Sequence, residues 1–264
     1  MKQGKRVACV LVFAGLDPSG GAGIQADIQA ITAAGAHTLP IITALTVQTN
    51  QRVHAVHPVN DTILREQCQA LIHHGTRVDA VKIGIVGQAI NAMVIAEFID
   101  QLRVIHPQLP VVLDPVLASG HGDVLTQGDA VRALAPLRRR TTLMTPNLPE
   151  AWQLTNCDDI ASQAAQLLQD SPHVLIKGGH GAGQEVVNTW FHQQGHRAWQ
   201  WLRLSGEFHG SGCTLASAVA ARLAQGAVME DALDAAQRYT QQSLDSAFRI
   251  ADGQLIPDRA ASES

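Results

Sequence analysis

VACVLVFAGLDPSGGAGIQADIQAITAA, the stretch from Val7 to Ala34, indicates how this chain folds. It opens with an almost continuous apolar run, Val7–Ala14, which predicts a β-strand buried on both faces. The run is too short for a signal peptide and leads into Asp17 and Pro18 without a cleavage site. A glycine-rich turn follows, and Gly23–Ala34 then has a helical composition. A buried strand followed directly by a helix is the repeating unit of α/β proteins.

The same unit recurs along the chain. The other expected strands are Leu39–Leu45, Val78–Ile83, Val111–Asp114, Thr142–Met144 and Val174–Lys177. The other expected helices are Thr62–His74, Gln88–Gln101, Gly128–Leu137, Ile160–Gln169, Gly212–Ala224 and Met229–Phe248. Thr189–Phe191 and Ala198–Leu204 are expected to form a β-hairpin. This order predicts one α/β domain over residues 1–264, with a mostly parallel sheet and helices on both faces. The polar tail, residues 252–264, is expected to be loosely held.

Composition excludes several classes of protein. Of the 264 residues, 46% are hydrophobic and only 16% are charged, which excludes a disordered chain. A net charge of −4 gives no broad basic field, so we expect no nucleic-acid partner. No apolar stretch is long enough for a membrane helix, and we expect no membrane partner. The four cysteines form no CxxC pair and predict reduced thiols, hence a cytoplasmic protein.

The turn after the first strand is the first candidate site. Gly20, Gly21 and Gly23 allow backbone amides to approach a ligand closely at the start of a helix. Asp17 and Asp27 bring two carboxylates to the carboxyl end of the strand, where open α/β sheets bind ligands. The segment matches neither the P-loop nor the GxGxxG pattern. A strand-to-helix turn without a ligand therefore remains the alternative.

A second glycine-rich segment, HGSGCT from His209 to Thr214, opens a long Ala-rich helix. Gly210, Ser211, Gly212 and Cys213 would present consecutive N–H groups at the positive end of the helix dipole, which favours an anion. The same position is expected to favour the thiolate of Cys213. An ordinary N-cap formed by Ser211 is the alternative.

Three further motifs place polar groups at expected strand ends. Asp114 ends VVLD, and Lys177 ends VLIK before two glycines, where it can pair with a carboxylate or bind phosphate. Asn147 and Glu150 lie three residues apart in TPNLPEA at a helix start and suit hydrated Mg²⁺ held near phosphates. A capping box would explain Glu150 equally well. Glycine-rich backbone, a helix N-terminus, a lysine and carboxylates are together what phosphoryl transfer requires.

These motifs resemble those of the ribokinase-like superfamily, and within it the hydroxymethylpyrimidine/phosphomethylpyrimidine kinases of thiamine biosynthesis. The matching strings, in order between Ala14 and Ala224, are AGLDPSGGAGIQAD, ITALTVQTN, KIGI, VLDPV, GDVL, TPNLPEA, KGGH and HGSGCTL. The resemblance implies a ribokinase-like fold with a small or absent lid. It also implies ATP- and Mg²⁺-dependent phosphorylation of 4-amino-5-hydroxymethyl-2-methylpyrimidine and then of its monophosphate, and a homodimer.

The resemblance assigns roles to residues at matching positions. Cys213 stands where sugar-kinase relatives carry a general base, and Lys177 matches the nucleotide lysine, which makes these two the expected catalytic residues. Expected substrate-binding residues are Gln48, Asp27, Gly15 and Val47. Expected anion-hole and ATP-binding residues are Gly210, Ser211, Gly212, Lys177, Asn147 and His209. Expected Mg²⁺ ligands are Glu150 and Asp114. An amide at Gln48 can donate and accept at once, as an aminopyrimidine requires.

The chain departs from the family pattern in several places. Ser211 replaces the usual Thr, Glu207 adds a carboxylate near the phosphate region, and VLASGHG at residues 116–122 lacks a lysine. The ending is reduced to GQLIPDR. A pyridoxal or pyridoxine kinase is the nearest alternative function, because some of these share the pattern, and a non-catalytic pyrimidine-binding protein is another. A sugar kinase fits least well, since Cys213 replaces the Asp that its mechanism uses.

Overall fold

The computed structural model describes residues 6–119 and 122–260. Within these residues the chain forms a nine-stranded mixed sheet, ordered β3-β2-β1-β4-β5-β6-β7-β8-β9. The strands are β1 (Cys9–Leu16), β2 (His37–Gln48), β3 (Val53–Pro58), β4 (Ala80–Ile83), β5 (Val111–Leu113), β6 (Leu143–Met144), β7 (His173–Ile176), β8 (Glu185–His192) and β9 (Gly195–Leu202). Pairing is parallel from β2 through β7, and antiparallel at the two edges, β3 and β8–β9.

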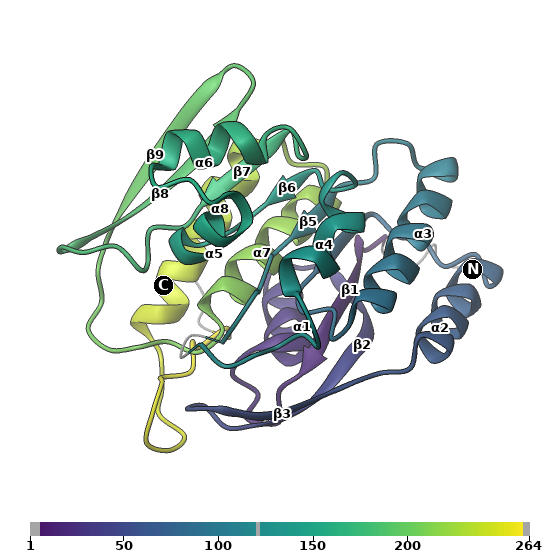
Figure 1. Cartoon of the computed structure of the whole chain (residues 1–264), viewed down its shortest axis with the longest axis horizontal. Coiled ribbons are helices and arrows are strands. Elements are labelled where there is room, and N and C mark those ends of the chain that lie inside the picture. Colours follow the sequence, from purple (N-terminus) through teal and green to yellow (C-terminus); the bar gives the residue numbers. More distant parts are fainter. Residues whose placement is uncertain (1–5, 120–121, 261–264) are drawn as a thin grey trace.

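Helices cover both faces of the sheet (Figure 1). They are α1 (Gly23–Ala33), α2 (Asp61–His73), α3 (Ala89–Ile105), α4 (Ala130–Arg138), α5 (Leu148–Thr155), α6 (Ile160–Leu167), α7 (Ser211–Ala224) and α8 (Met229–Asp245). Alternate side chains of β1 enter different cores: Leu11 and Phe13 pack with α2–α6, whereas Val10 and Val12 pack with α1, α7 and α8. Burial on both faces explains the continuous apolar strands, and the expected α/β architecture is confirmed.

The order of the strands positions the site. The chain moves from β1 outward to β2 and β3, then returns to place β4 on the other side of β1. This reversal is a topological switch point, where the loops after neighbouring strands separate and leave a crevice at the carboxyl edge of the sheet. The ends of β1, β4, β5, β6 and β7 all meet at this edge, because these strands run parallel.

The expected strands and the hairpin are all present, with bounds shifted by a few residues. The strand β3 was not expected, because VHAVHP carries two histidines, ends on a proline and pairs only with β2 at the edge. Together β2 and β3 form an antiparallel ribbon that reaches the site, which agrees with the small lid implied by the resemblance. Only the start of α5 was expected from the sequence.

The expectation of a loosely held tail is wrong for residues 254–260. Ile256 is 4% exposed and Arg259 is 3% exposed, and Leu255 forms a β-bridge with Phe208. A buried guanidinium and two apolar side chains outweigh the polar composition that suggested a free end. Residues 261–264 lie outside the described residues.

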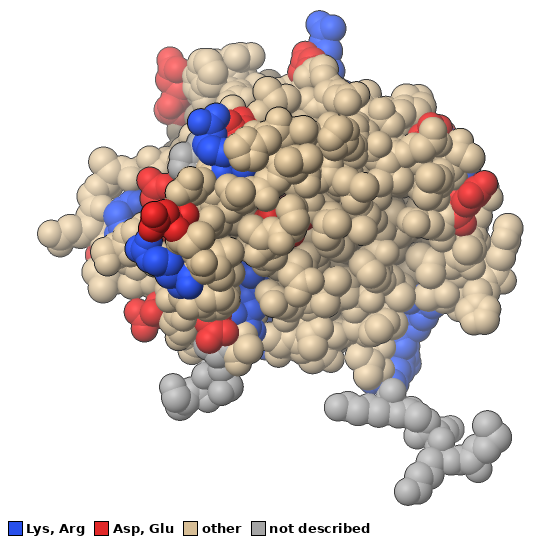
Figure 2. Space-filling view, turned by 90° about the horizontal axis from the view of Figure 1, so that it is seen from below, with Lys and Arg blue, Asp and Glu red and all other residues tan. Residues whose placement is uncertain are grey.

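Charged side chains of both signs are scattered over the face seen in Figure 2 and gather towards one end of it, without a continuous basic area. Among the described residues, no helix combines the length and the apolar composition needed to cross a bilayer.

Candidate active site

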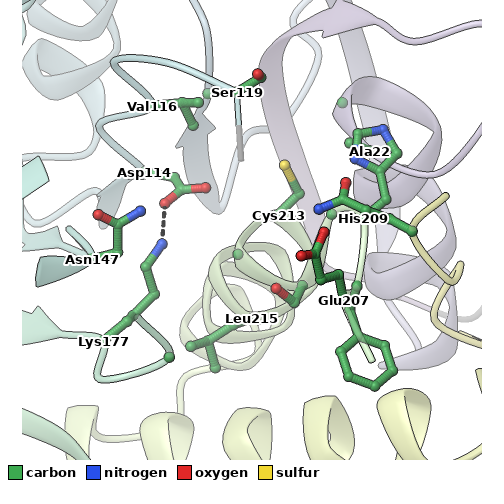
Figure 3. Close-up of a pocket in the computed structure, with 18 of the residues that line it drawn as sticks. Ala22, Asp114, Val116, Ser119, Asn147, Lys177, Glu207, His209, Cys213 and Leu215 are labelled. Carbon is green, nitrogen blue, oxygen red and sulfur yellow. Dashed lines mark hydrogen bonds and ion pairs between the residues drawn. The ribbon is translucent and has the colours of Figure 1, made fainter. Parts of the chain in front are cut away.

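A cavity of about 590 Å³ opens at the carboxyl edge of the sheet (Figure 3). Its lining comes from the ends of the parallel strands, the β2–β3 ribbon and the first turn of α7. All the expected site residues line it except Asp27 and Val47. The topology therefore brings together motifs that lie up to 200 residues apart in the sequence.

The glycine turn after β1 is organised by Asp17. This carboxylate is 4% exposed and accepts hydrogen bonds from the Ser19 and Ala22 amides, at 2.8 and 2.9 Å. It also faces Nε2 of His209 at 2.7 Å. Burial opposes the charge on Asp17, but the hydrogen bonds from His209 and Ser19 outweigh it and lower the pKa. Asp17 is therefore an ionised anchor for the turn, and its oxygens are already occupied by protein groups.

His209 connects this turn to the expected pyrimidine-binding residue. Its Nε2 lies 3.0 Å from Nε2 of Gln48, and the Gln48 carbonyl accepts a 3.1 Å hydrogen bond from Thr46. Because a carboxylate can only accept, Nε2 of His209 donates to Asp17. The sequence analysis placed His209 with the nucleotide-binding residues, but the structure places it beside Gln48. His209 therefore lies at the Gln48 end of the cavity.

The N-terminus of α7 opens into the cavity without a side-chain cap. Gly210 is the N-cap at φ 82°, a left-handed conformation that favours glycine, and no side chain caps the first turn. The alternative in which Ser211 is the N-cap is wrong, because Ser211 is the first helical residue. A Cβ on Gly210 would also lie 2.1 Å from the Gly21 carbonyl oxygen, so the two glycine turns pack directly against each other.

Lys177 lies opposite this helix end. Its Nζ donates to Oδ1 of Asp114 at 2.7 Å, the contact drawn in Figure 3. Burial alone would lower the pKa of Lys177, but Asp114 and Glu150 outweigh it and raise the pKa, so the lysine is a cation. A Cβ on Gly212 would lie 3.0 Å from this Nζ. The glycine thus leaves the space between the helix end and the lysine open.

Asn147 and Glu150 form the capping box of α5. Oδ1 of Asn147 accepts from the Glu150 amide at 2.9 Å, and Oε2 of Glu150 accepts from the Asn147 amide at 2.8 Å. The Asn147 oxygen is thereby used, and its NH₂ group is left for a phosphate oxygen. Burial raises the pKa of Glu150 to about 7, and Lys177 counteracts this. The capping role and a ligand role are compatible, since one carboxylate oxygen remains.

The expectation that Asp27 contacts the substrate disagrees with the structure. Asp27 is fully buried beneath the cavity, where it pairs with Lys82 at 2.8 Å and accepts from the Ser217 hydroxyl at 2.7 Å. Lys82 itself lines the cavity and was missed by the sequence analysis. A single lysine within the apolar strand AVKI was the available signal, because a fully buried lysine requires a partner. Asp27 is therefore one step removed from any ligand.

Val47 does not line the cavity and is 51% exposed. Side chains alternate along a strand, so Thr46 and Gln48 face the cavity while Val47 points to the opposite side of β2. The expected role of Val47 in binding the substrate is corrected accordingly.

The thiol of Cys213 lies in the first turn of α7, between Asp114 and His209 (Figure 3). The sequence analysis expected its thiolate to be favoured. Instead, burial raises the pKa of Cys213 to about 11, with Asp27 and Asp114 adding to the rise and Lys82 opposing it. The helix terminus does not compensate for burial beside two carboxylates. In this structure Cys213 is a thiol.

Comparison with known proteins agrees with this geometry. The model of the family described as phosphomethylpyrimidine kinase matches residues 17–257. The chain belongs to this family. It is 37% identical over 261 residues to the hydroxymethylpyrimidine/phosphomethylpyrimidine kinase of Rhizobium meliloti (strain 1021), and the match covers 94% of both chains. The chain is 36% identical to the thiamine biosynthesis multifunctional protein ThiED of Corynebacterium efficiens, but spans only 35% of that protein's length.

Two kinases of known structure share the fold of this chain. The phosphomethylpyrimidine kinase of Clostridium difficile 630 is 30% identical, with a TM-score of 0.73 over 89% of this chain and 98% of that one. The pyridoxal kinase of Bacillus subtilis, solved as an ADP complex, is 26% identical, with a TM-score of 0.83 over 97% and 98%. The resemblance to this family and to the ribokinase-like fold is confirmed.

Proposed function

We propose that this cavity transfers the γ-phosphoryl group of ATP to the hydroxymethyl group of 4-amino-5-hydroxymethyl-2-methylpyrimidine, and then phosphorylates the monophosphate to the diphosphate. Both reactions belong to thiamine biosynthesis. The observation that supports the proposal most strongly is the uncapped N-terminus of α7, which opens into the cavity opposite Lys177. An uncapped helix end and a lysine form an anion site for the phosphoryl group in transit.

The pyrimidine would bind at the end of the cavity formed by the β2–β3 ribbon. Gln48 offers an amide that can pair with the ring nitrogen and the neighbouring amino group. Thr46 donates a hydrogen bond to the oxygen of that amide, and His209 lies against its nitrogen. Gly15 lines the same end, and its lack of a side chain allows Ile85, which also lines the cavity, to pack against it. A pyridine ring lacks the paired donor and acceptor, so this end favours an aminopyrimidine over pyridoxal.

The nucleotide phosphates would bind between Lys177, the Asn147 NH₂ group and the amides of residues 211–213. Asp114 and Glu150 are the residues that would hold Mg²⁺, since hard carboxylate oxygens suit it and their pair lies beside Lys177. Among the described residues no group of three or more His, Cys, Asp or Glu side chains could hold a metal, so the remaining ligands would be phosphate oxygens and water. When bound, Mg²⁺ would neutralise phosphate charge.

Cys213 would accept the proton of the substrate hydroxyl at its sulfur. That role requires the thiolate, which burial disfavours here. The positive charge of Lys82 supports the thiolate, and so does any neutralisation of Asp114. The amides of α7 would meanwhile stabilise the charge on the transferring phosphoryl oxygens.

A Cys213→Ala variant tests this assignment. Turnover should fall by about 100-fold or more, while the Kd of the pyrimidine, measured by calorimetry, stays unchanged. Cys157→Ala is the matched control, because Cys157 lies outside the cavity. Normal turnover in a folded Cys213→Ala variant would contradict the role of the cysteine.

We also propose a cytoplasmic homodimer. All four cysteines are free, as in a reducing compartment, and the outer side of β2 exposes Leu45 (48%) and Val47 (51%), which a second copy would cover. Light scattering should give twice the mass of the chain, and Val47→Lys should halve it. A monomeric wild-type protein would contradict this proposal.

A further inference from the structure

The C-terminal segment carries a buried arginine, Arg259, that has no part in the proposed reaction. Arg259 is 3% exposed and lies behind the two glycine turns that line the cavity. The sequence analysis noted only that GQLIPDR is a reduced version of the family's ending. A charged side chain is rarely buried so completely unless it has a specific role.

The guanidinium connects the two turns through their carbonyl groups. One terminal nitrogen donates to the Gly21 oxygen at 2.5 Å and lies 3.5 Å from the Gly210 oxygen. Its Nε donates to the Thr214 hydroxyl at 2.8 Å, and that hydroxyl donates to the Gly210 oxygen at 2.9 Å. The other terminal nitrogen reaches Gln29 on α1 at 3.2 Å. One planar group therefore joins the turn after β1, the N-cap of α7 and helix α1.

The orientation of these carbonyls matters for the cavity. Each peptide plane carries its N–H opposite its C=O. A carbonyl held towards Arg259 therefore directs the next amide away from it. The Gly210 oxygen accepts from the Thr214 amide and hydroxyl, both at 2.9 Å, and Arg259 holds that hydroxyl in place, so the Ser211 amide is fixed at the opening of α7. The fork of five donors suits this task, whereas a lysine could supply only a point charge.

The positive charge of Arg259 lies behind the first turn of α7, where it would stabilise an anion bound at the N-terminus of that helix. Among the described residues, the oxygens that accept its hydrogen bonds belong to backbone carbonyls, a hydroxyl and an amide, all of which are neutral. Burial lowers its pKa, and Cys213 and Tyr239 oppose this fall. A cation without a direct carboxylate partner behind the first turn of α7 adds to the positive end of the helix dipole.

The segment that carries Arg259 is itself fixed to the body of the protein. The Tyr239 hydroxyl donates to the Arg259 carbonyl at 2.9 Å, and the Asp258 amide donates to the Ser243 carbonyl at 2.8 Å. Leu255 exchanges backbone hydrogen bonds with Glu207 and His209 on either side of Phe208. The arginine is thus held on both sides.

We propose that Arg259 is a positioning residue for phosphoryl transfer: it fixes the two glycine turns against each other and keeps the first amides of α7 directed at the phosphate site. It contacts no reacting atom. The inference rests on the proposed role of residues 210–213 as the anion hole. It assigns a function to the C-terminal segment, which the proposed reaction does not otherwise use.

Two variants, Arg259→Ala and Arg259→Lys, test the proposal. In Arg259→Ala, kcat/KM for Mg·ATP should fall about 10- to 100-fold, because loss of positioning costs on that scale. The Kd of the pyrimidine should change little. Millimolar guanidinium chloride, compared with equal NaCl, should restore part of the activity of Arg259→Ala, because the ion fits the space left. Arg259→Lys should stay impaired, and guanidinium should not help it.

Arg249→Ala is the matched control, since Arg249 is an exposed arginine of the same C-terminal region. Wild-type kcat/KM in a folded Arg259→Ala variant would overturn the proposal. Full activity of Arg259→Lys would also overturn it. So would an Arg259→Ala variant in which pyrimidine binding weakens as much as kcat/KM for Mg·ATP falls and guanidinium restores neither. If Arg259→Ala does not fold, Arg259→Lys carries the test through its KM for ATP. Wild-type protein that makes no phosphorylated pyrimidine would instead contradict the proposed function, and the effect of Arg259 on Mg·ADP affinity would still test the positioning role.

Discussion

Asp17 shows how much one side chain contributes to this site. Its Oδ2 accepts hydrogen bonds from the Ala22 amide and the Ser19 hydroxyl, both at 2.9 Å, and contacts His209. It therefore fixes the first glycine turn and the ring of His209, which lies beside the Gln48 amide. The sequence indicated a carboxylate at this strand end but not that its partners would be protein groups, because those contacts join residues 192 positions apart.

The lowered pKa of Asp17 predicts how stability depends on pH. A carboxyl group whose pKa is lower in the folded state contributes stability above its unfolded pKa, about 3.8, and loses it as pH falls through the folded value. Asp17→Asn should therefore reduce the free energy of unfolding by about 1.5–3 kcal/mol at pH 7, with a smaller difference below about pH 4. Urea denaturation from pH 3 to 7 measures this. Asp158→Asn, at an exposed position, should show no such trend.

A difference between Asp17→Asn and wild type that stays constant from pH 3 to 7 would contradict the ionised anchor.

The sequence predicted the position of single residues correctly where the motif and the strand end coincided, and the roles of these residues stay predictions. Lys177, Asp114, Gln48 and Cys213 all line the cavity as expected. Val47 failed because its neighbour's side chain faces the cavity and strand alternation turns it away. Asp27 failed because its partner, Lys82, lies 55 residues further along the chain and the pair is fully buried.

At the scale of elements, the first turn of α7 is the centre of the proposed reaction. Its amides open into the cavity, and Gly212 leaves space for Lys177. Gly212 has no positive φ, so backbone freedom does not explain why a glycine stands here. The space that it leaves in front of Lys177 does.

Gly212→Ala separates stability from activity. The protein should be as stable as wild type or gain up to about 1 kcal/mol, since alanine favours a helix. The new Cβ, 3.0 Å from Nζ of Lys177, should displace the lysine and lower kcat/KM for Mg·ATP about 10-fold or more. Thermal unfolding and steady-state kinetics measure the two effects.

Ala224→Gly, at the other end of α7, is the matched control and should lower stability while leaving the kinetics unchanged. Unaltered kinetics of Gly212→Ala would show that the lysine does not need this space.

Among the elements, the buried parallel strands and the long helices could be predicted, because continuous apolar runs and helical periodicity mark them. The edge strand β3 could not, since it is short, both of its histidines are exposed, and it pairs only with β2. The tail could not either, because its order depends on the buried contacts of Arg259 with residues far away in the sequence.

At the scale of the whole molecule, the weak net charge of −4 has a structural explanation. The proposed phosphate site consists of a few local groups, the α7 amides and Lys177 with Arg259 behind them, and the face seen in Figure 2 has no continuous basic area. Such a site gains little from long-range steering.

Raising the salt concentration from about 50 to 200 mM should therefore change kcat/KM for Mg·ATP by less than about three-fold. Initial rates at constant free Mg²⁺ measure this. A fall of ten-fold or more would indicate that a wider field attracts the nucleotide.

Product analysis of a single reaction tests the central claim most directly. The protein is incubated with Mg·ATP and equal concentrations of 4-amino-5-hydroxymethyl-2-methylpyrimidine and pyridoxal, and the products are identified by mass spectrometry. We predict the pyrimidine monophosphate followed by the diphosphate, with little phosphorylated pyridoxal. Pyridoxal 5′-phosphate as the sole product would contradict the account.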